Sequence, residues 1–425
     1  MKKFYLIAAA AAAVLAAGCA KNEVIQNQGP GDAVSFGVYV PKTVTKAGTA
    51  GTITTDGTGS TVSLQTEGFG VFATWSDHAD YSSAIGPNFM WNTHVTYDTS
   101  SWKYEPVKYW PNETITDGSN AAHGPSDIAD KLSFFAYGPY VAPAAATGLF
   151  TPAETTGITT LTSNGATTDP MVTYVVDSDP SNSVDLIWAV AGSAFSYTDV
   201  NGSTVSVEAG KPFKNLTKPS HSLTIPFHFR HATARLGFKV VGAFDQVAAG
   251  GTLESGTKVT VSDVRIVGLP VAATGTLNLN NTTANTPLWT ATPSTVNLIV
   301  NGDDLNANIK DSGNAEVQTV PGVTASPQNV FDNDNKFFTL IPIETSITAR
   351  VKITYYVTTA DSNLSAGFSR VENVIYKDLT FASGFQAGKA YTIKIILGLT
   401  SVKLEADVEN WTVLLDTDVD LPINS

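Results

Sequence analysis

The histidines are the first residues in this 425-residue chain whose side chains could bind a metal or move a proton. No H-E-x-x-H pattern is present. His228 and His231 flank Arg230, and a spacing of three in a strand puts two side chains on opposite faces of a sheet. We therefore predict packing or solvated positions for the histidines and no shared metal. The six are His78, His94, His123, His221, His228 and His231.

Two segments resemble ligand-binding loops without completing them. Residues 332–335 (D-N-D-N) begin like a calcium loop, but Lys336 and Phe337 stand where the sharp turn needs Gly, and no Glu closes the ligand set. Residues 251–256 have glycines at phosphate-loop spacing but lack the Lys and the Ser or Thr that hold a nucleotide. A plain turn is predicted for residues 332–335, and no cofactor is expected.

Catalytic patterns are equally weak in this chain. There is no G-x-S-x-G nucleophile elbow. A glycosidase needs only two carboxylates, and nothing singles out a pair among the 38 Asp and Glu residues. We predict that the protein is not an enzyme, with an unrecognised hydrolase as one alternative.

The chain has a single cysteine, Cys19, at the end of an N-terminal export signal. Lys2 and Lys3 precede 14 apolar residues, 4–17, which are too few to span a membrane comfortably and are typical of a signal peptide. Residues 15–19 (L-A-A-G-C) resemble a bacterial lipobox, although Ala16 replaces the usual bulky residue. We predict a lipoprotein signal over 1–19, lipid attachment at Cys19 and a polar tether over 20–32. The alternative is an ordinary secretory signal with an incidental cysteine.

Composition describes a folded and acidic protein. A chain of 425 residues predicts two or three domains, and 43% hydrophobic with 15% charged residues excludes global disorder. The net charge of -13 repels phosphate backbones, so nucleic acid is not an expected partner. Together with the export signal, these features indicate a cell-surface protein held to the outer membrane by lipid.

Strand patterns dominate the rest of the chain. Val34, Phe36, Val38 and Val40 alternate with other residues until Pro41, which is typical of a half-buried strand. Short strands with turn-rich connectors predict an all-β fold of antiparallel β-sandwiches, with domains at 33–210 and 211–425. One short helix is expected over 240–249. Similar strand runs occur at 70–75, 132–137, 171–176, 223–229, 236–241, 259–267, 337–341, 350–357, 391–397 and 402–408.

Several short motifs, in this order, are similar to those of the fimbrillin (Mfa-like, FimA-like) family of Bacteroidales lipoproteins. The resemblance spans nearly the whole chain, from the lipobox onward. Its carriers are the strand at 34–40 with P-K-T-V-T-K-A at 41–47, W-K-Y at 102–104, V-K-Y-W-P at 107–111, L-S-F-F-A-Y at 132–137, F-H-F-R-H-A at 227–232 with R-L at 235–236, and F-Q-A-G-K-A-Y at 385–391.

The resemblance implies a pilus subunit with no enzyme activity. It implies two transthyretin-like β-sandwich domains in tandem, export as a lipoprotein, and removal of the first strand by a trypsin-like surface protease. Another subunit's strand would then fill the vacated groove by donor-strand exchange, so the partners would be other pilus subunits. Host or bacterial surface ligands are further candidate partners, and the position as stalk, tip or anchor stays open.

The residues offer a donor strand at the C-terminal end, over 411–425. Apolar side chains share one face there, in the same spacing as the first strand, and burying five of them contributes roughly 8 to 15 kcal/mol before ordering costs. The alternative is that this segment simply closes the second domain as an edge strand. The five are Val413, Leu415, Val419, Leu421 and Ile423.

Lys46 is the predicted cleavage site for proteolytic release. It precedes Ala47 and Gly48 in a turn-rich linker. A cut after Lys46 removes lipid, tether and first strand together. The family's processed members are typically cut after Arg, which this linker lacks. An uncut chain would fit a permanently anchored subunit at the pilus base.

Four tryptophans in the first half support a different alternative, a surface glycan-binding lipoprotein. Exposed aromatic faces stack on sugar rings, whereas buried ones fill a core. The residues are Trp75, Trp91, Trp102 and Trp110.

Overall fold

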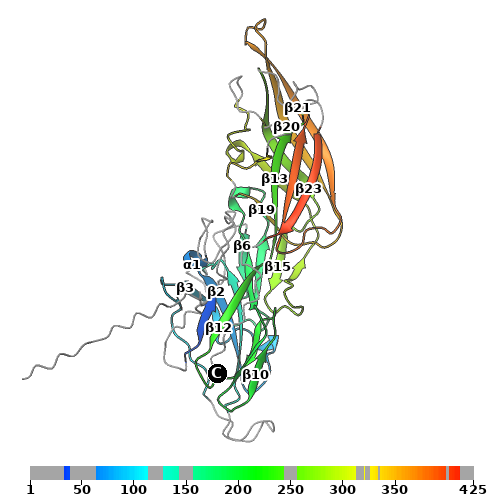
Figure 1. Ribbon diagram of the computed structural model, residues 1–425. Coiled ribbons are helices and arrows are strands. Elements are labelled where there is room, and N and C mark those ends of the chain that lie inside the picture. The colour runs from blue at the N-terminus through cyan, green and yellow to red at the C-terminus, as the bar shows by residue number, and fades with distance from the viewer. Residues whose placement is uncertain are drawn as a thin grey trace, which may run out of the picture.

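The computed structural model describes an all-β protein, as predicted. It describes residues 33–38, 64–112, 128–142, 157–243, 256–312, 320, 326–333, 336–398 and 402–411. In these ranges the only helical elements are α1 (Leu64–Glu67) and the 3-10 turns η1 (Ser83–Ile85), η2 (Pro180–Asn182) and η3 (Gly302–Asp304). None of the helices in the same ranges is long and apolar enough to cross a membrane. Figure 1 shows an elongated molecule with a lower and an upper lobe.

The lower lobe is built on the largest sheet of the described chain. Its order is β1-β12-β8-β5-β2-β3-β4, and β11 also pairs with β5. The strands are β1 (Ser35–Val38), β2 (Phe69–Ser76), β3 (Met90–Tyr97), β4 (Trp102–Lys103), β5 (Lys131–Gly138), β8 (Ile187–Ala191), β11 (Phe213–Leu216) and β12 (Thr224–His231).

This sheet is buried on both faces, which explains its nearly continuous apolar strands. Neighbouring residues of a strand point to opposite faces, so Phe134 and Phe135 of β5 enter different cores. Phe134 lies in a core confined to the lower lobe. Part of that core comes from a small hairpin of β9 (Phe195–Thr198) and β10 (Thr204–Val207), which contributes Phe195 and Val207.

The second face of the sheet contributes to a core that continues into the upper lobe. Phe135 and Trp188 from the lower lobe belong to the same buried cluster as Phe238 and Ile353 from the upper lobe. A sheet of order β16-β15-β7-β6 also contributes Val172 and Leu277 to it. Its strands are β6 (Gly157–Leu161), β7 (Met171–Val175), β15 (Thr274–Asn278) and β16 (Leu288–Ala291).

The upper lobe consists of two further sheets whose buried faces share this core. One has the order β18-β13-β22-β23, with β19 also on β13, and the other has the order β17-β14-β20-β21. The strands are β13 (Ala234–Gly242), β14 (Thr257–Leu269), β17 (Val296–Asn301), β18 (Gln328–Asn329), β19 (Phe338–Leu340), β20 (Ile347–Ala360), β21 (Phe368–Phe381), β22 (Lys389–Leu397) and β23 (Val402–Asn410).

The chain crosses between the lobes where β12 runs almost directly into β13. Only Ala232 and Thr233 separate the two strands. The Ala232 N–H donates to the Leu186 carbonyl at 2.8 Å, and the Trp289 indole N–H donates to the Ala232 carbonyl at 2.8 Å. Strands β11 and β12 pair with the lower sheet. Both follow residue 211, where the second domain was expected to begin.

Each strand run expected from the sequence overlaps a strand of the structure. Two expectations need correction. The pairs β1–β12 and β13–β22 are parallel, so the sheets are not purely antiparallel. Residues 240–242, expected to begin a short helix, belong to β13, because they continue its parallel ladder with β22 and bury Val240 and Val241 on its two faces. Residues 244–249 of that predicted helix lie outside the described chain.

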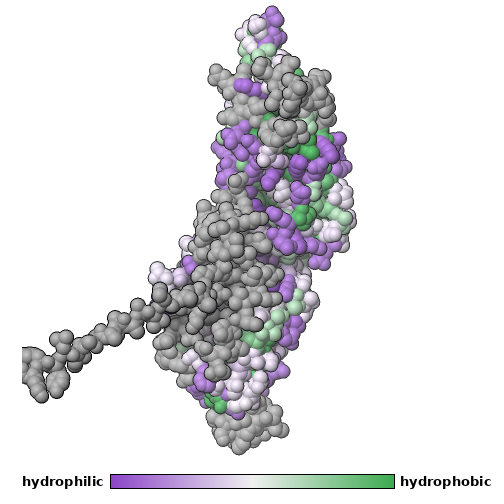
Figure 2. Space-filling view, in the orientation of Figure 1, coloured by the Kyte–Doolittle hydropathy of each residue, from purple (hydrophilic) through white to green (hydrophobic). Residues whose placement is uncertain are grey.

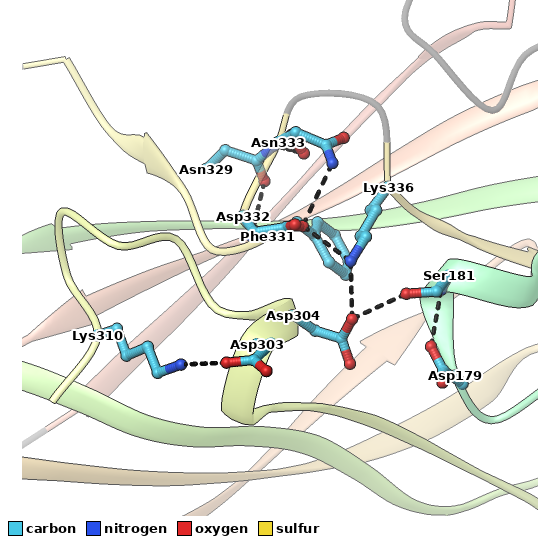
Figure 3. A network of polar contacts seen from close by, with 10 residues as sticks. All are labelled: Asp179, Ser181, Asp303, Asp304, Lys310, Asn329, Phe331, Asp332, Asn333 and Lys336. Carbon is cyan, nitrogen blue, oxygen red and sulfur yellow. Dashed lines mark hydrogen bonds and ion pairs between the residues drawn. The ribbon is translucent and has the colours of Figure 1, made fainter. Parts of the chain in front are cut away.

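A polar network joins the connection after β7 to loops of the upper lobe (Figure 3). The Ser181 hydroxyl donates to Asp304 Oδ1 at 2.9 Å, and Lys336 Nζ contacts Asp304 Oδ1 at 2.8 Å and Asp332 Oδ1 at 3.1 Å. Burial lowers the pKa of Lys336, but hydrogen bonds and charges from the two carboxylates outweigh it and raise the pKa overall. A lysine ammonium thus occupies the side-chain cluster around Asp332, where the sequence predicted a turn without calcium.

Hydrophobic surface on the face in view is scattered in small patches among hydrophilic side chains (Figure 2). In the upper lobe, strand β21 carries exposed apolar residues, with Val371 56%, Val374 48% and Tyr376 48% exposed. These side chains leave β21 with only a weak alternation of apolar and polar residues, and no strand was predicted there from the sequence.

Candidate assembly groove at the first strand

Strand β1 buries the alternating side chains that the sequence assigned to it. Val34 and Phe36 are each 2% exposed, and Val38 is half-buried. Between them, the Ser35 hydroxyl donates to the Leu223 carbonyl at 3.2 Å and lies 3.1 Å from the Thr224 hydroxyl. The fourth predicted residue, Val40, lies outside the described chain.

Strand β1 is hydrogen-bonded on one side to β12. The two strands are parallel, from Ser35 opposite Thr224 to Val38 opposite Phe227. Strand β1 is the edge strand of this sheet in the described chain, and β12 is its neighbour there. Loss of β1 would leave the peptide groups of β12 that face it without partners, and such an edge accepts another strand.

A second flank comes from the segment after β4. The Val34 N–H donates to the Lys108 carbonyl at 2.9 Å, and Ala33 forms an antiparallel bridge with Tyr109. The Tyr104 hydroxyl donates to the Val34 carbonyl at 2.7 Å. Strand β1, together with Ala33 and Val34 just before it, therefore lies in a slot: β12 pairs with the strand on one side, and Tyr104 and Lys108 bind Val34 on the other.

Phe36 fills an aromatic socket at the centre of this slot. Its ring centroid lies 5.3 Å from that of Tyr104, 5.7 Å from that of Phe134 and 5.4 Å from that of Phe227, which it stacks upon. Full burial of a Val or Phe side chain stabilises by about 1.5–3 kcal/mol, so Val34 and Phe36 together contribute roughly 3–6 kcal/mol to docking. Removal of Phe36 would uncover the rings of Tyr104, Phe134 and Phe227 that it contacts.

Tyr104 keeps its proton at neutral pH and remains a donor to β1. Burial raises the pKa of Tyr104 to about 12, the hydrogen bond with the Lys108 backbone lowers it, and the charges of Tyr109 and Glu105 raise it. The sequence grouped residues 102–111 as a motif but did not identify it as the flank of β1. The signal available was the cluster of aromatic residues there.

The candidate donor segment begins at a residue anchored beside β12. Trp411 is 6% exposed and donates its N–H to the Gly388 carbonyl at 2.8 Å. Its ring stacks on His231, the last residue of β12, with centroids 3.8 Å apart, and meets Phe337 edge-on at 5.5 Å. His231 Nδ1 in turn lies 2.7 Å from Asp185 Oδ1.

The other predicted assembly residues lie outside the described chain. These are the lipid attachment residue Cys19, the cleavage residue Lys46 and the donor residues Val413, Leu415, Val419, Leu421 and Ile423.

The tryptophans considered for sugar binding are tied to the protein interior. Trp102 and Trp110 are 7% and 2% exposed and belong to the lower core, so their faces are not open to a ligand. Trp75 and Trp91 are half-buried, and the Trp91 indole N–H donates to the Thr162 carbonyl at 2.7 Å. Trp102 and Trp110 therefore have the alternative role considered for these residues, which is packing in the core.

Comparison with known proteins gives one family match and relatives of similar length. The family model described as fimbrillin-like matches residues 125–411. The fimbrium subunit Fim1C of Phocaeicola vulgatus is 25% identical over 426 residues, covering 95% of this chain and 96% of the relative. A fimbrial protein from Bacteroides vulgatus, known from a crystal structure, has a TM-score of 0.57 at 19% identity and covers 90% of this chain and 100% of its own. This second likeness concerns the fold.

Proposed function

The chain belongs to the fimbrillin-like family, and from this premise we propose that it is a structural subunit of a cell-surface fimbria assembled by donor-strand exchange. The observation that carries the proposal is the slot around β1. Val34 and Phe36 are buried there, yet β1 is hydrogen-bonded to β12 on one side, and Val34 just before it is hydrogen-bonded to Tyr104 and Lys108 on the other. A strand bound in this way can be exchanged for another of the same alternation without rebuilding the sheet.

Export and release follow from the N-terminal sequence. In the proposal, residues 1–19 direct export, Cys19 carries the lipid that holds the precursor to the outer membrane, and residues 20–32 form the tether. A trypsin-like protease cuts after Lys46 and frees β1 from the mature subunit. A chain that escapes this cut stays attached and serves as an anchored base subunit.

The donor is the C-terminal segment 411–425 of another subunit. Its five apolar residues repeat the spacing of Val34, Phe36 and Val38, so they can occupy equivalent sockets. Trp411 supports this role because it fixes the start of the segment against His231 at the end of β12.

For the domains we propose two transthyretin-like β-sandwiches in tandem. The strand pairing supports a crossing at Ala232 and Thr233, because β11 and β12 pair with the lower sheet. The shared core and the β7–β15 pairing favour a rigid two-lobed subunit.

A proteolysis experiment on the full-length chain tests the proposal. Treatment with a trypsin-like protease should produce a ladder of polymers that survives unheated detergent electrophoresis. Lys46→Ala should abolish the ladder, as should truncation before Trp411. Leu421→Asp should weaken it strongly, whereas Asp420→Ala, a change to a neighbour on the opposite face of the segment, should leave it intact.

A synthetic peptide of residues 411–425 provides a second readout. It should bind the protease-treated protein, stop polymer growth and protect β12 amides from hydrogen exchange. A ladder that forms normally from chains lacking 411–425 would contradict donor-strand exchange by this segment.

A further inference from the structure

Three side chains that can bind metal lie close together at one end of the lower sheet. At this end β2 stops and β5 begins. Ser76, the last residue of β2, pairs with Lys131, the first residue of β5. This antiparallel register places Asp77 and His78, just after β2, beside Asp130, just before β5. Asp130 is far in the sequence from Asp77 and His78, which is why no metal signature was found there in the sequence.

Their geometry suits a cation better than direct pairing. His78 Nε2 lies 3.6 Å from Asp130 Oδ1, beyond hydrogen-bond length. The three residues offer one ligand atom each, and all three atoms lie within 4.8 Å of one another. Bonds of about 2.0–2.1 Å from a tetrahedral zinc ion would separate two ligand atoms by about 3.3 Å, so His78 Nε2 and Asp130 Oδ1 need only a small adjustment, and the exposed Asp77 side chain would move further to join them.

The two inner atoms also lack hydrogen-bond partners. The Asp130 side chain is 1% exposed, and in the described part of the chain neither its Oδ1 nor His78 Nε2 has a hydrogen-bond partner. A buried carboxylate oxygen without a partner is unfavourable, and metal coordination is one of the ways proteins satisfy it. The adjacent cation does not fill this role, because Lys131 Nζ contacts Asp80 at 2.6 Å.

We propose that Asp77, His78 and Asp130 bind a divalent transition-metal ion, with Zn²⁺ as the best fit. An imidazole with carboxylates suits zinc, whereas calcium and magnesium prefer oxygen ligands alone. His78 Nε2 and Asp130 Oδ1 are the inner ligands. Asp77, whose side chain is 67% exposed, supplies the third ligand from the solvent side, and water completes the coordination. The ion would fasten the end of β2 to the start of β5.

The test is zinc binding by the full chain after treatment with a chelator. Titration calorimetry should show one saturable site, and zinc should raise the melting temperature because it binds the folded state. His78→Asn and Asp130→Asn should each lower the affinity at least about tenfold and remove the thermal shift. Asn suits both positions, because His78 has a φ of 50°, which Asn tolerates, and because Asn is close to Asp in size.

Asp80→Asn is the matched control. It removes a carboxylate from the same loop, 73% exposed, and leaves the three ligands in place. The proposal predicts wild-type zinc affinity for this variant. Absence of saturable binding to the wild-type chain would overturn the site, and so would equal affinity in Asp130→Asn, His78→Asn and Asp80→Asn. Polymer formation is a separate readout, so this result and that of the assembly test are independent.

Discussion

Phe36 and Tyr104 show how single residues prepare a strand for exchange. The Phe36 ring is held by contacts with three other rings, and the Tyr104 hydroxyl donates to the carbonyl of Val34, just before β1. A donor residue entering the socket would regain the apolar contacts, and any donor strand offers a carbonyl to Tyr104. The slot therefore recognises spacing and size rather than one particular side chain.

Alkaline pH should loosen β1 through Tyr104. Its pKa in the docked state is about 12 against an ordinary 10.0, so docking is fully favoured below pH 10 and weakens as the pH rises from 10 through 12. Hydrogen exchange at β12 amides, measured across this range, should show the loss. Tyr104→Phe should weaken docking by about 0.5–1.5 kcal/mol at neutral pH and should lack this part of the pH response.

Tyr376→Phe is the control for that experiment, because Tyr376 is 48% exposed and lies on β21 in the upper lobe, away from the slot. An identical pH response in wild type and Tyr104→Phe would rule out the role assigned to Tyr104.

At the scale of elements, strands with clear alternation were predictable and strands shaped by their surroundings were not. Strand β1 has one apolar face, and the sequence identified it. In β21 the neighbouring residues Val374 and Ile375 are both apolar and belong to opposite faces, so the period is lost. The stability of β21 comes instead from its long ladder with β20, which runs from Ile347 opposite Phe381 to Ala360 opposite Phe368.

The groove was predictable only in part for the same reason. Alternation revealed the strand that leaves and a segment able to replace it, but not the neighbours. The parallel partner β12, the flank at Lys108 and the cluster of Asp77, His78 and Asp130 all depend on contacts between residues distant in sequence. A one-dimensional pattern contains no information about such registers.

Trp411→Ala should detach the end of β23 without disturbing the strands beneath it. The change removes the stacking on His231 and the edge contact with Phe337. Hydrogen exchange should become faster at the Asn410 end of β23, while the β13–β22 ladder keeps its protection. Val408→Ala, at a side chain 54% exposed, should change little. Unchanged exchange at Asn410 in Trp411→Ala would contradict the anchoring role.

At the scale of the whole molecule, the lobes share one core and should unfold together. Leu277 on β15 is fully buried in that core. Leu277→Ala should cost about 2–5 kcal/mol and lower the melting temperature in a single calorimetric transition. Protection of β2 in the lower lobe and of β14 in the upper lobe should fall in parallel.

Leu288→Ala, at a 36% exposed position on the neighbouring β16, is the control and should have a small effect. Two separate transitions in the Leu277→Ala protein would mean that the lobes fold independently.

The direct run of β12 into β13 also has a mechanical consequence. In a fibre built as proposed, a pull from the neighbouring subunit enters beside β12 and passes to β13, then across the parallel ladder to β22 and on to β23 and Trp411. Strands pulled lengthwise past each other must break many hydrogen bonds at once, whereas strands peeled from one end lose them singly. Tension along such a filament would therefore pull β13 and β22 lengthwise past each other, which is the direction in which their parallel ladder resists most.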